Sequence, residues 1–121
     1  MKFKLTLDAK PSKYPIQYGD KLMLIGSCFT ENIGAKFKTH LFELSENPYG
    51  ILFNPVSVVT TLTEIMDKRM YKVEDLFQHN ELWHSWHHHS RFSGITQTEA
   101  LAKINNAIQE AHSYLKSAHH L

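Results

Sequence analysis

The stretch LMLIGSCFTENIGAKF, residues 22–37, decides the fold that we predict for this chain. Its first four residues form an apolar run without alternation, which is typical of a strand covered on both faces within a parallel sheet. Gly26 ends this run. Apolar residues then recur at every fourth position, on one face of a helix, at Phe29, Ile33, Phe37 and Leu41. The stretch therefore predicts a buried strand, a tight turn and a helix packed on the sheet.

Two more helices are predicted downstream. Asn54-Pro55 offers an N-cap followed by proline at the first helical position. The apolar face of that helix would be Val58, Val59, Leu62, Ile65 and Met66, although its β-branched residues favour a strand locally. Thr96 and Glu99 form a capping-box pair for the last helix, which runs to Lys116. Its apolar face would be Leu101, Ile104, Ile108, Ala111 and Leu115.

Two segments are less regular. Near the start, Phe3, Leu5 and Leu7 alternate with Lys2, Lys4 and Thr6, which predicts an edge strand or a hairpin arm. Residues 70–94 carry Trp83 and Trp86 among histidines without a clean period. We predict an irregular or short-stranded excursion there.

Composition narrows the class of protein. A chain of 121 residues with 42% hydrophobic residues can form one compact core. Its formal net charge of +1, without a long run of one sign, argues against nucleic acid as a partner. No apolar stretch approaches the roughly twenty residues that cross a bilayer, so no membrane partner is expected. The single cysteine, Cys28, and a start that does not resemble a secretory signal predict a cytoplasmic protein. The oligomeric state is left open.

The order of the predicted elements indicates an α/β fold with a central parallel sheet. The sequence stops at Leu121, where an alternating α/β protein would enter its next strand. One buried strand cannot satisfy both of its own edges. We therefore expect the sequence to continue, with residues 1–121 as the N-terminal part of a single domain.

Ser27 is the first candidate for chemistry. A side chain at the turn after a parallel strand lies at the carboxyl edge of the sheet, where α/β folds bind their ligands. The N-terminus of the following helix would stabilise an oxyanion formed there, which suits acyl transfer. The alternative is that Ser27 only caps the helix, as serine commonly does.

Cys28 is a rival nucleophile, because a thiol near a helix N-terminus can react as a thiolate. The alternative is a small buried residue that packs behind the turn. The sequence leaves both open.

Three blocks of the chain resemble the GSCFA family. They are LIGSCFTENIG at residues 24–34, NPYGILFNPVS at residues 47–57 and LWHSWHHHSRFS at residues 82–93. That family is similar to SGNH/GDSL-like hydrolases, so the resemblance implies a three-layer α/β/α fold, cut short here after the third helix. It also implies ester hydrolysis by a serine nucleophile, which matches Ser27.

The resemblance suggests further site residues. The turn at residues 47–50 falls where such enzymes place their second block, which makes the Gly50 N–H a candidate oxyanion donor. The other candidates for oxyanion or substrate contacts are Cys28, Asn54, His84, His88 and His89. The family's later asparagine block and its Asp and His block have no counterpart before Leu121. Because a serine without its general base is a weak nucleophile, residues 1–121 alone are expected to be nearly inactive.

Histidine is abundant, with nine residues in the chain and four between positions 84 and 89. In an extended segment His87 and His89 would face one side and His84 and His88 the other, so one face offers too few ligands for zinc. We expect no metal and no cofactor. These histidines could line the cleft near Ser27, or simply contribute polar surface and aromatic packing. The resemblance argues against one of them acting as the base.

Three functions are compatible with these features. The first is a serine hydrolase acting on an acyl or acetyl ester of a small molecule or carbohydrate. The second is a noncatalytic module that keeps the hydrolase scaffold and binds a ligand. The third, a metal-dependent protein using the histidines, has the least support.

Overall fold

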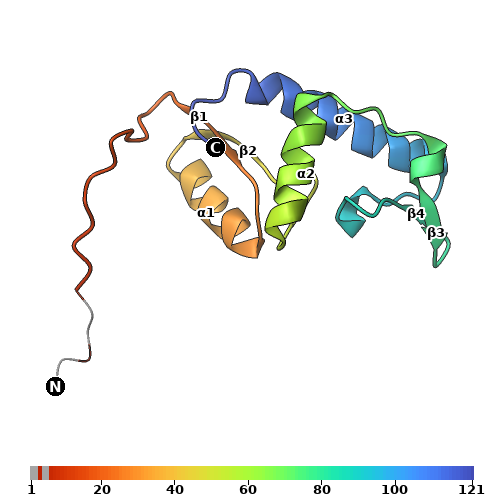
Figure 1. The fold of residues 1–121 in the computed structure, drawn as a ribbon, viewed down its shortest axis with the longest axis horizontal. Coiled ribbons are helices and arrows are strands. Elements are labelled where there is room, and N and C mark those ends of the chain that lie inside the picture. The colour runs from red at the N-terminus through yellow and green to blue at the C-terminus, as the bar shows by residue number, and fades with distance from the viewer. Residues whose placement is uncertain (1–2, 4–5) are drawn as a thin grey trace.

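The computed structural model describes residue 3 and residues 6–121 (Figure 1). In these residues the elements follow the order β1 (Lys21–Leu24), α1 (Cys28–Thr39), β2 (Glu43–Glu46), α2 (Pro55–Met66), β3 (Phe77–His79), β4 (Leu82–His84) and α3 (Gln97–Leu115). Two short 3₁₀ helices, η1 (Val73–Asp75) and η2 (Ser90–Phe92), flank the β3–β4 hairpin. The chain is thus a mixed α/β protein with a small parallel sheet.

β1 is hydrogen-bonded along both of its edges. It pairs in parallel with β2, with Leu22 opposite Leu44 and Met23 opposite Ser45. On its other side it meets the chain again after α3, because Met23 N–H donates to His120 O at 3.0 Å. Hydrogen bonding on both edges accounts for the complete burial of Met23. The predicted return of the chain to the sheet after the third helix is confirmed in this bridge.

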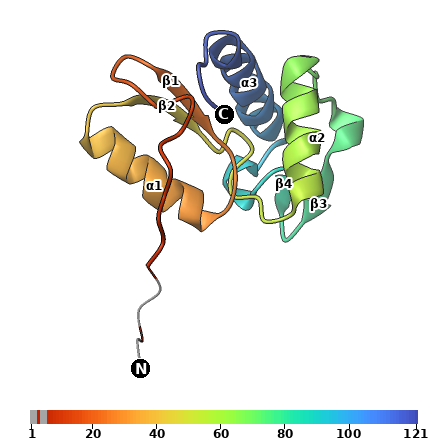
Figure 2. The ribbon, with the colours of Figure 1, turned by 60° about the vertical axis from the view of Figure 1, so that its left-hand side comes forward.

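Helices cover both faces of β1. Leu24 points towards Gly34 of α1, whereas Met23 belongs to the core formed with α2 and α3. Successive residues of a strand face opposite sides, so β1 separates α1 from the other two helices. Figure 2 shows α1 apart from the pair α2 and α3.

α1 confirms the predicted strand, turn and helix, and its predicted apolar face is confirmed in part, because Ile33 and Phe37 are half-buried. Phe29 is exposed, and Leu41 lies beyond the helix end in the left-handed region with φ 63°. The buried residue is Gly34, against which the Glu46 side chain packs so closely that a Cβ would clash. This close contact is possible because glycine has no side chain. A count of apolar positions does not detect such a contact.

α2 begins where predicted, because the Asn54 side chain accepts from Val56 N–H at 2.8 Å and Pro55 is the first helical residue. Its predicted apolar face is confirmed in part, because Ile65 is fully buried and Val58 and Leu62 are half-buried. Val59 and Met66 are exposed, and the buried residues are Thr61, Glu64 and Ile65. Hydrogen bonds from other elements satisfy Glu64, so a charged residue occupies a position that apolar periodicity assigns to the surface.

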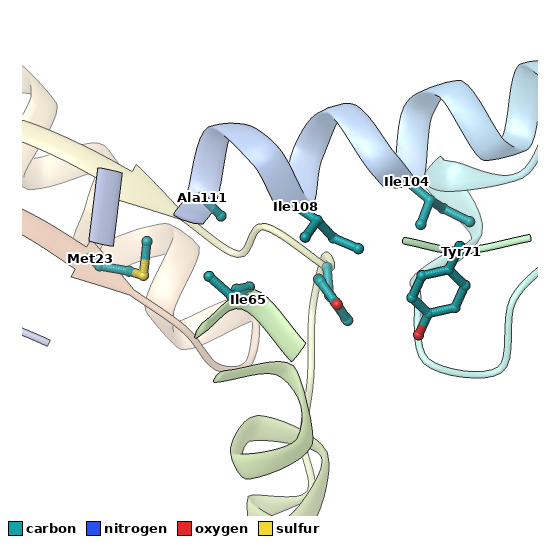
Figure 3. Packing of buried hydrophobic residues seen from close by; sticks show 7 residues of the cluster. Met23, Ile65, Tyr71, Ile104, Ile108 and Ala111 are labelled. Atoms are coloured by element: carbon teal, nitrogen blue, oxygen red, sulfur yellow. The ribbon is translucent and has the colours of Figure 1, made fainter. Parts of the chain in front are cut away.

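α3 follows the prediction most closely. Thr96 caps it by accepting from Glu99 N–H at 3.1 Å, and the Glu99 carboxylate accepts from Ile95 N–H. Its buried residues are Ala100, Ile104, Ile108 and Ala111, and the predicted Leu101 and Leu115 pack partly buried against the core. Figure 3 shows Ile104 and Ile108 pointing from α3 towards Ile65 and Tyr71. This is the core that holds the helices to the sheet.

Of the predictions for the two remaining segments, one is confirmed and one is wrong. The excursion at residues 70–94 is confirmed as the β3–β4 hairpin with its two 3₁₀ turns. The predicted N-terminal strand is wrong where it can be judged, because Phe3, Thr6 and Leu7 form no strand and are exposed. Lys2, Lys4 and Leu5 lie outside the described residues. No strand is formed by residues 6–20. The first part of this segment extends away from the helices (Figure 1), whereas Tyr18 stacks on Phe42 with ring centroids 4.7 Å apart. Among the described helices, none combines the length and apolarity that a membrane span requires.

We expect Ile108→Ala to reduce the free energy of unfolding by about 2–5 kcal/mol, because it opens a cavity in the fully buried core. The matched control is Ile95→Ala, since Ile95 is 73% exposed and should change stability by less than about 0.5 kcal/mol. Urea unfolding followed by circular dichroism measures both. Equal effects would contradict the packing described for α3.

Candidate functional site

Ser27 occupies the turn between the end of β1 and the start of α1. It is the N-cap of α1, with extended backbone angles (φ −80°, ψ −172°), and its Oγ accepts from Phe29 N–H at 3.3 Å. Within residue 3 and residues 6–121, no histidine or carboxylate hydrogen-bonds to Ser27 Oγ. The capping role is therefore present in this structure, and the hydroxyl lacks an activating base among these residues.

Asn47 braces the turn that carries Ser27. Its Oδ1 accepts from Gly26 N–H at 2.8 Å, and its own N–H donates to Leu24 O at 2.8 Å. Its carbonyl accepts from Gly50 N–H at 2.7 Å, and its Nδ2 lies 3.4 Å from Glu31 Oε1. Asn47 is 3% exposed and adopts φ 44°, a left-handed conformation that asparagine tolerates well. One side chain thus joins the end of β1 to the first turns of α1.

An ion pair extends this bracing to the segment after β4. Arg91 Nη2 donates to Glu31 Oε1 at 2.7 Å, and this hydrogen bond holds the pKa of Glu31 below its ordinary value. Both side chains are partly exposed, so the pair contributes little stability by itself. Its effect is to place η2 beside the N-terminal part of α1.

Cys28 follows Ser27 directly, and Gly50 lies in the turn that Asn47 links to Gly26. Cys28 is exposed, so the prediction of a buried cysteine behind the turn is wrong. As the first residue of α1, its N–H has no acceptor within the helix. The Gly50 N–H is already used in the turn to Asn47, so it is not free to receive an oxyanion in this structure. Its φ of 84° and its tight packing against His89 explain why glycine stands there.

Asn54 and His84 serve the local fold. Asn54 caps α2 with its side-chain oxygen. His84 uses both ring nitrogens within the hairpin region, with Nδ1 2.6 Å from Ser93 Oγ and Nε2 3.1 Å from His79 O. Neither side chain is hydrogen-bonded to the turn at Ser27.

His88 and His89 pack against the turn at residues 47–50 and do not line an open cleft. The His88 ring stacks on Tyr49, with centroids 3.9 Å apart, and burial lowers its pKa to about 3. It is therefore neutral at ordinary pH. His89 caps η2 by accepting from Arg91 N–H, and its own N–H donates to Tyr49 O at 2.9 Å. These contacts join the histidine segment to the second block without exposing a base to Ser27.

The structure reveals a buried carboxylate network that the sequence analysis missed. Glu64 Oε2 accepts from Tyr49 Oη at 2.7 Å and from Tyr71 Oη at 2.8 Å. Glu64 Oε1 is paired with the Arg69 guanidinium and lies 3.1 Å from His87 Nδ1. Burial by itself would raise the pKa of Glu64, but these hydrogen bonds outweigh it and lower the pKa. The signal in the sequence is that Glu64 lies three residues after Thr61 and next to Ile65, on the stripe that faces the core.

The four clustered histidines thus point to different places. His84 is bonded within the hairpin and His87 lies against Glu64. His88 stacks on Tyr49, and His89 caps η2. In the described part of the chain, no three His, Cys, Asp or Glu side chains gather in a way that could hold a metal ion.

We expect Asn47→Ala to lower the free energy of unfolding by about 1–3 kcal/mol, because it leaves the Gly26 N–H without its acceptor. The strained φ adds to this loss, since alanine tolerates the left-handed region poorly. Asn106→Ala is the control, as Asn106 is exposed on α3. Urea titration of the two variants measures both free energies of unfolding. Equal values within error would show that the Asn47 side chain does not stabilise the turn.

Acid should weaken the Glu64 network. Because the folded pKa of Glu64 lies below its unfolded value, its contribution is complete above about pH 4.5 and is lost as the pH falls through the folded pKa. We expect Glu64→Gln to unfold about 1–3 kcal/mol more easily at pH 7 and to lose less stability on acidification. Thermal unfolding at pH 7, 5, 4 and 3 tests this, with Glu110→Gln, at an exposed position of α3, as control. Parallel pH profiles for wild type and Glu64→Gln would refute the network's role.

Comparisons with known proteins give one match. The model of the GSCFA family matches residues 21–121, which include the Ser27 turn, the turn at residues 47–50 and the histidine segment. A search of curated proteins finds no match. A search of solved structures also finds none. Since the match spans every helix and strand described above, the chain belongs to the GSCFA family.

Proposed function

We propose that the intact protein is a serine hydrolase of the SGNH/GDSL type that cleaves acyl or acetyl esters, with Ser27 as its nucleophile. The observation that carries this proposal is the position of Ser27 between the parallel strand β1 and the N-terminus of α1. That edge of an α/β sheet is where ligands bind, and the helix end favours negative charge. Membership of the GSCFA family supports a hydrolase-like activity.

The reaction needs three groups. Ser27 Oγ would attack the ester carbonyl and pass its proton to a general base, while the carbonyl oxygen becomes an oxyanion. The Cys28 N–H, the first free donor after the nucleophile, is well placed to hold that oxyanion. The alcohol then leaves with a proton, and water releases the acyl group from Ser27. The proposal places the general base outside the described residues, since none of these bonds to Ser27 Oγ.

We propose the substrate only as a class, namely an ester of a small molecule or a carbohydrate. The alternative function is a noncatalytic binding module on the same scaffold. The bond from Phe29 N–H to Ser27 Oγ is the observation that favours this alternative, because the hydroxyl caps α1 in this structure. The experiment below separates the two.

Ser27→Ala should abolish labelling of the intact protein by a fluorophosphonate and reduce ester turnover by several orders of magnitude. Ser27→Asn is the informative partner, because asparagine is a good N-cap but has no nucleophilic hydroxyl. It should restore much of the stability that Ser27→Ala loses, about 1 kcal/mol, and remain unlabelled. Cys28→Ala and Ser117→Ala should label as wild type does.

Three outcomes would overturn this proposal. Labelling of Ser27→Ala at the wild-type level would place the nucleophile elsewhere, and loss of labelling in Cys28→Ala alone would favour the thiol. A folded intact protein that takes no label and turns over no ester would leave the noncatalytic binding module.

A further inference from the structure

Trp86 stands out among the exposed aromatic side chains. It lies in the turn after β4 and is 81% exposed. Its ring stacks on Phe77 with centroids 4.1 Å apart and an angle of 17° between the planes. The stacking fixes the orientation of the ring, so that Trp86 offers a rigid flat surface to solvent. Exposed aromatic surface of this kind is characteristic of binding sites.

A polar cleft adjoins this ring. The cleft, which we call the Trp86 cleft, has a volume of about 250 Å³, and its lining includes Arg69, Glu74, Asp75, Ser85, Trp86 and His87. Arg69 Nη2 donates to Asp75 Oδ1 at 3.0 Å, and Arg69 also pairs with the buried Glu64. The exposed Glu74 carboxylate makes no hydrogen bond to the rest of the described chain. The Trp86 cleft therefore combines a flat apolar face with several hydrogen-bonding groups.

We propose that the Trp86 cleft binds a carbohydrate. The weakly positive C–H face of a sugar ring would stack on the electron-rich face of Trp86, while its hydroxyl groups bond to Glu74, Asp75 and Arg69. A sugar offers both contacts at once, because its ring has one apolar face and a rim of hydroxyls.

Other ligands fit the Trp86 cleft less well. An anion would gain little from Arg69, whose charge is already balanced by Glu64 and Asp75. A protein partner prefers an interface centre that is depleted of charged residues, whereas charged side chains surround this one. The volume is below the range of roughly 300–1,000 Å³ that is usual for drug-sized ligands, and it suits one or two sugar rings.

A carbohydrate bound in the Trp86 cleft would narrow the substrate class of the proposed hydrolase. The idea that the bound glycan carries the ester that Ser27 cleaves rests on the proposed function. Binding in the Trp86 cleft does not itself need Ser27. The two ideas can therefore fail independently.

The test titrates the intact protein with cellohexaose, xylohexaose and chitohexaose and follows the indole N–H signals of Trp86 and Trp83 by NMR. We expect at least one hexasaccharide to shift the Trp86 signal in a saturable way. Trp86→Ala should weaken binding at least about tenfold, measured by calorimetry. Glu74→Gln should weaken it by a smaller factor, because only one hydrogen-bonding group changes. Phe53→Ala, which removes a 77% exposed aromatic ring from a different loop, is the matched control and should bind normally.

Ser27→Ala should bind the same sugar as wild type, which separates this inference from the hydrolase proposal. Three results would overturn it. The first is no shift with any of the three sugars up to roughly 10 mM. The second is unchanged binding by a folded Trp86→Ala. The third is a Trp86 signal that responds to protein concentration and not to sugar, which would make the exposed ring a contact between copies of the chain.

Discussion

The hydrogen bonds of Asn47 are the constraint on which this end of the sheet depends. The side chain lies directly after β2, yet it holds the residue that follows β1 and reaches the first turns of α1. Its backbone continues the pairing with Leu24 and closes the turn with Gly50. All of its polar groups are thus occupied in a site that is 3% exposed. A buried amide with every group paired fixes geometry strongly, because losing any partner leaves a costly unsatisfied group.

A second constraint anchors the same turn from the other side. Tyr49 lies two residues after Asn47, and its hydroxyl bonds to Glu64 of α2. Its ring stacks on His88, and its carbonyl accepts from His89 N–H. The turn at residues 47–50 therefore connects α1, α2 and the histidine segment. The turn belongs to the second block of the family resemblance, and its contacts reach the first block through Gly26 and Glu31 and the third block through His88 and His89.

The sequence predicts the helices and the central strand well because their signals are local. Caps at Ser27, Asn54 and Thr96 determine where the helices start, and each cap bond spans two or three residues. The buried faces of α1 and α2 were harder to predict, because they depend on distant partners. Gly34 is buried because Glu46 packs on it, and Glu64 is buried because Tyr49 and Tyr71 satisfy it. Periodicity counts apolar residues and has no information about such partners.

In the candidate site, too, local features were predictable and tertiary contacts were not. The position of Ser27 at the strand-to-helix turn was predictable, because the sequence pattern on each side is unambiguous. The roles of the histidines were not, since residue type does not reveal which ring nitrogen is already bonded. His84 and His88 could have faced a cleft, but their rings are held by Ser93, Phe77 and Tyr49. The use of the Gly50 N–H in a turn is likewise a tertiary fact that depends on Asn47.

Capping and catalysis at Ser27 are compatible once the strength of the cap bond is considered. The distance of 3.3 Å from Phe29 N to Ser27 Oγ exceeds the usual range of about 2.7–3.2 Å, so the bond is weak. The turn does not depend on that bond, because Asn47 holds Gly26 independently. Rotation of Ser27 towards an ester carbonyl would therefore cost little and would release the Phe29 N–H. That group would then join the Cys28 N–H at the end of α1, where two donors and the helix dipole face the developing negative charge. If Ser27 is the nucleophile, as we propose, its attack would free these two donors for the oxyanion.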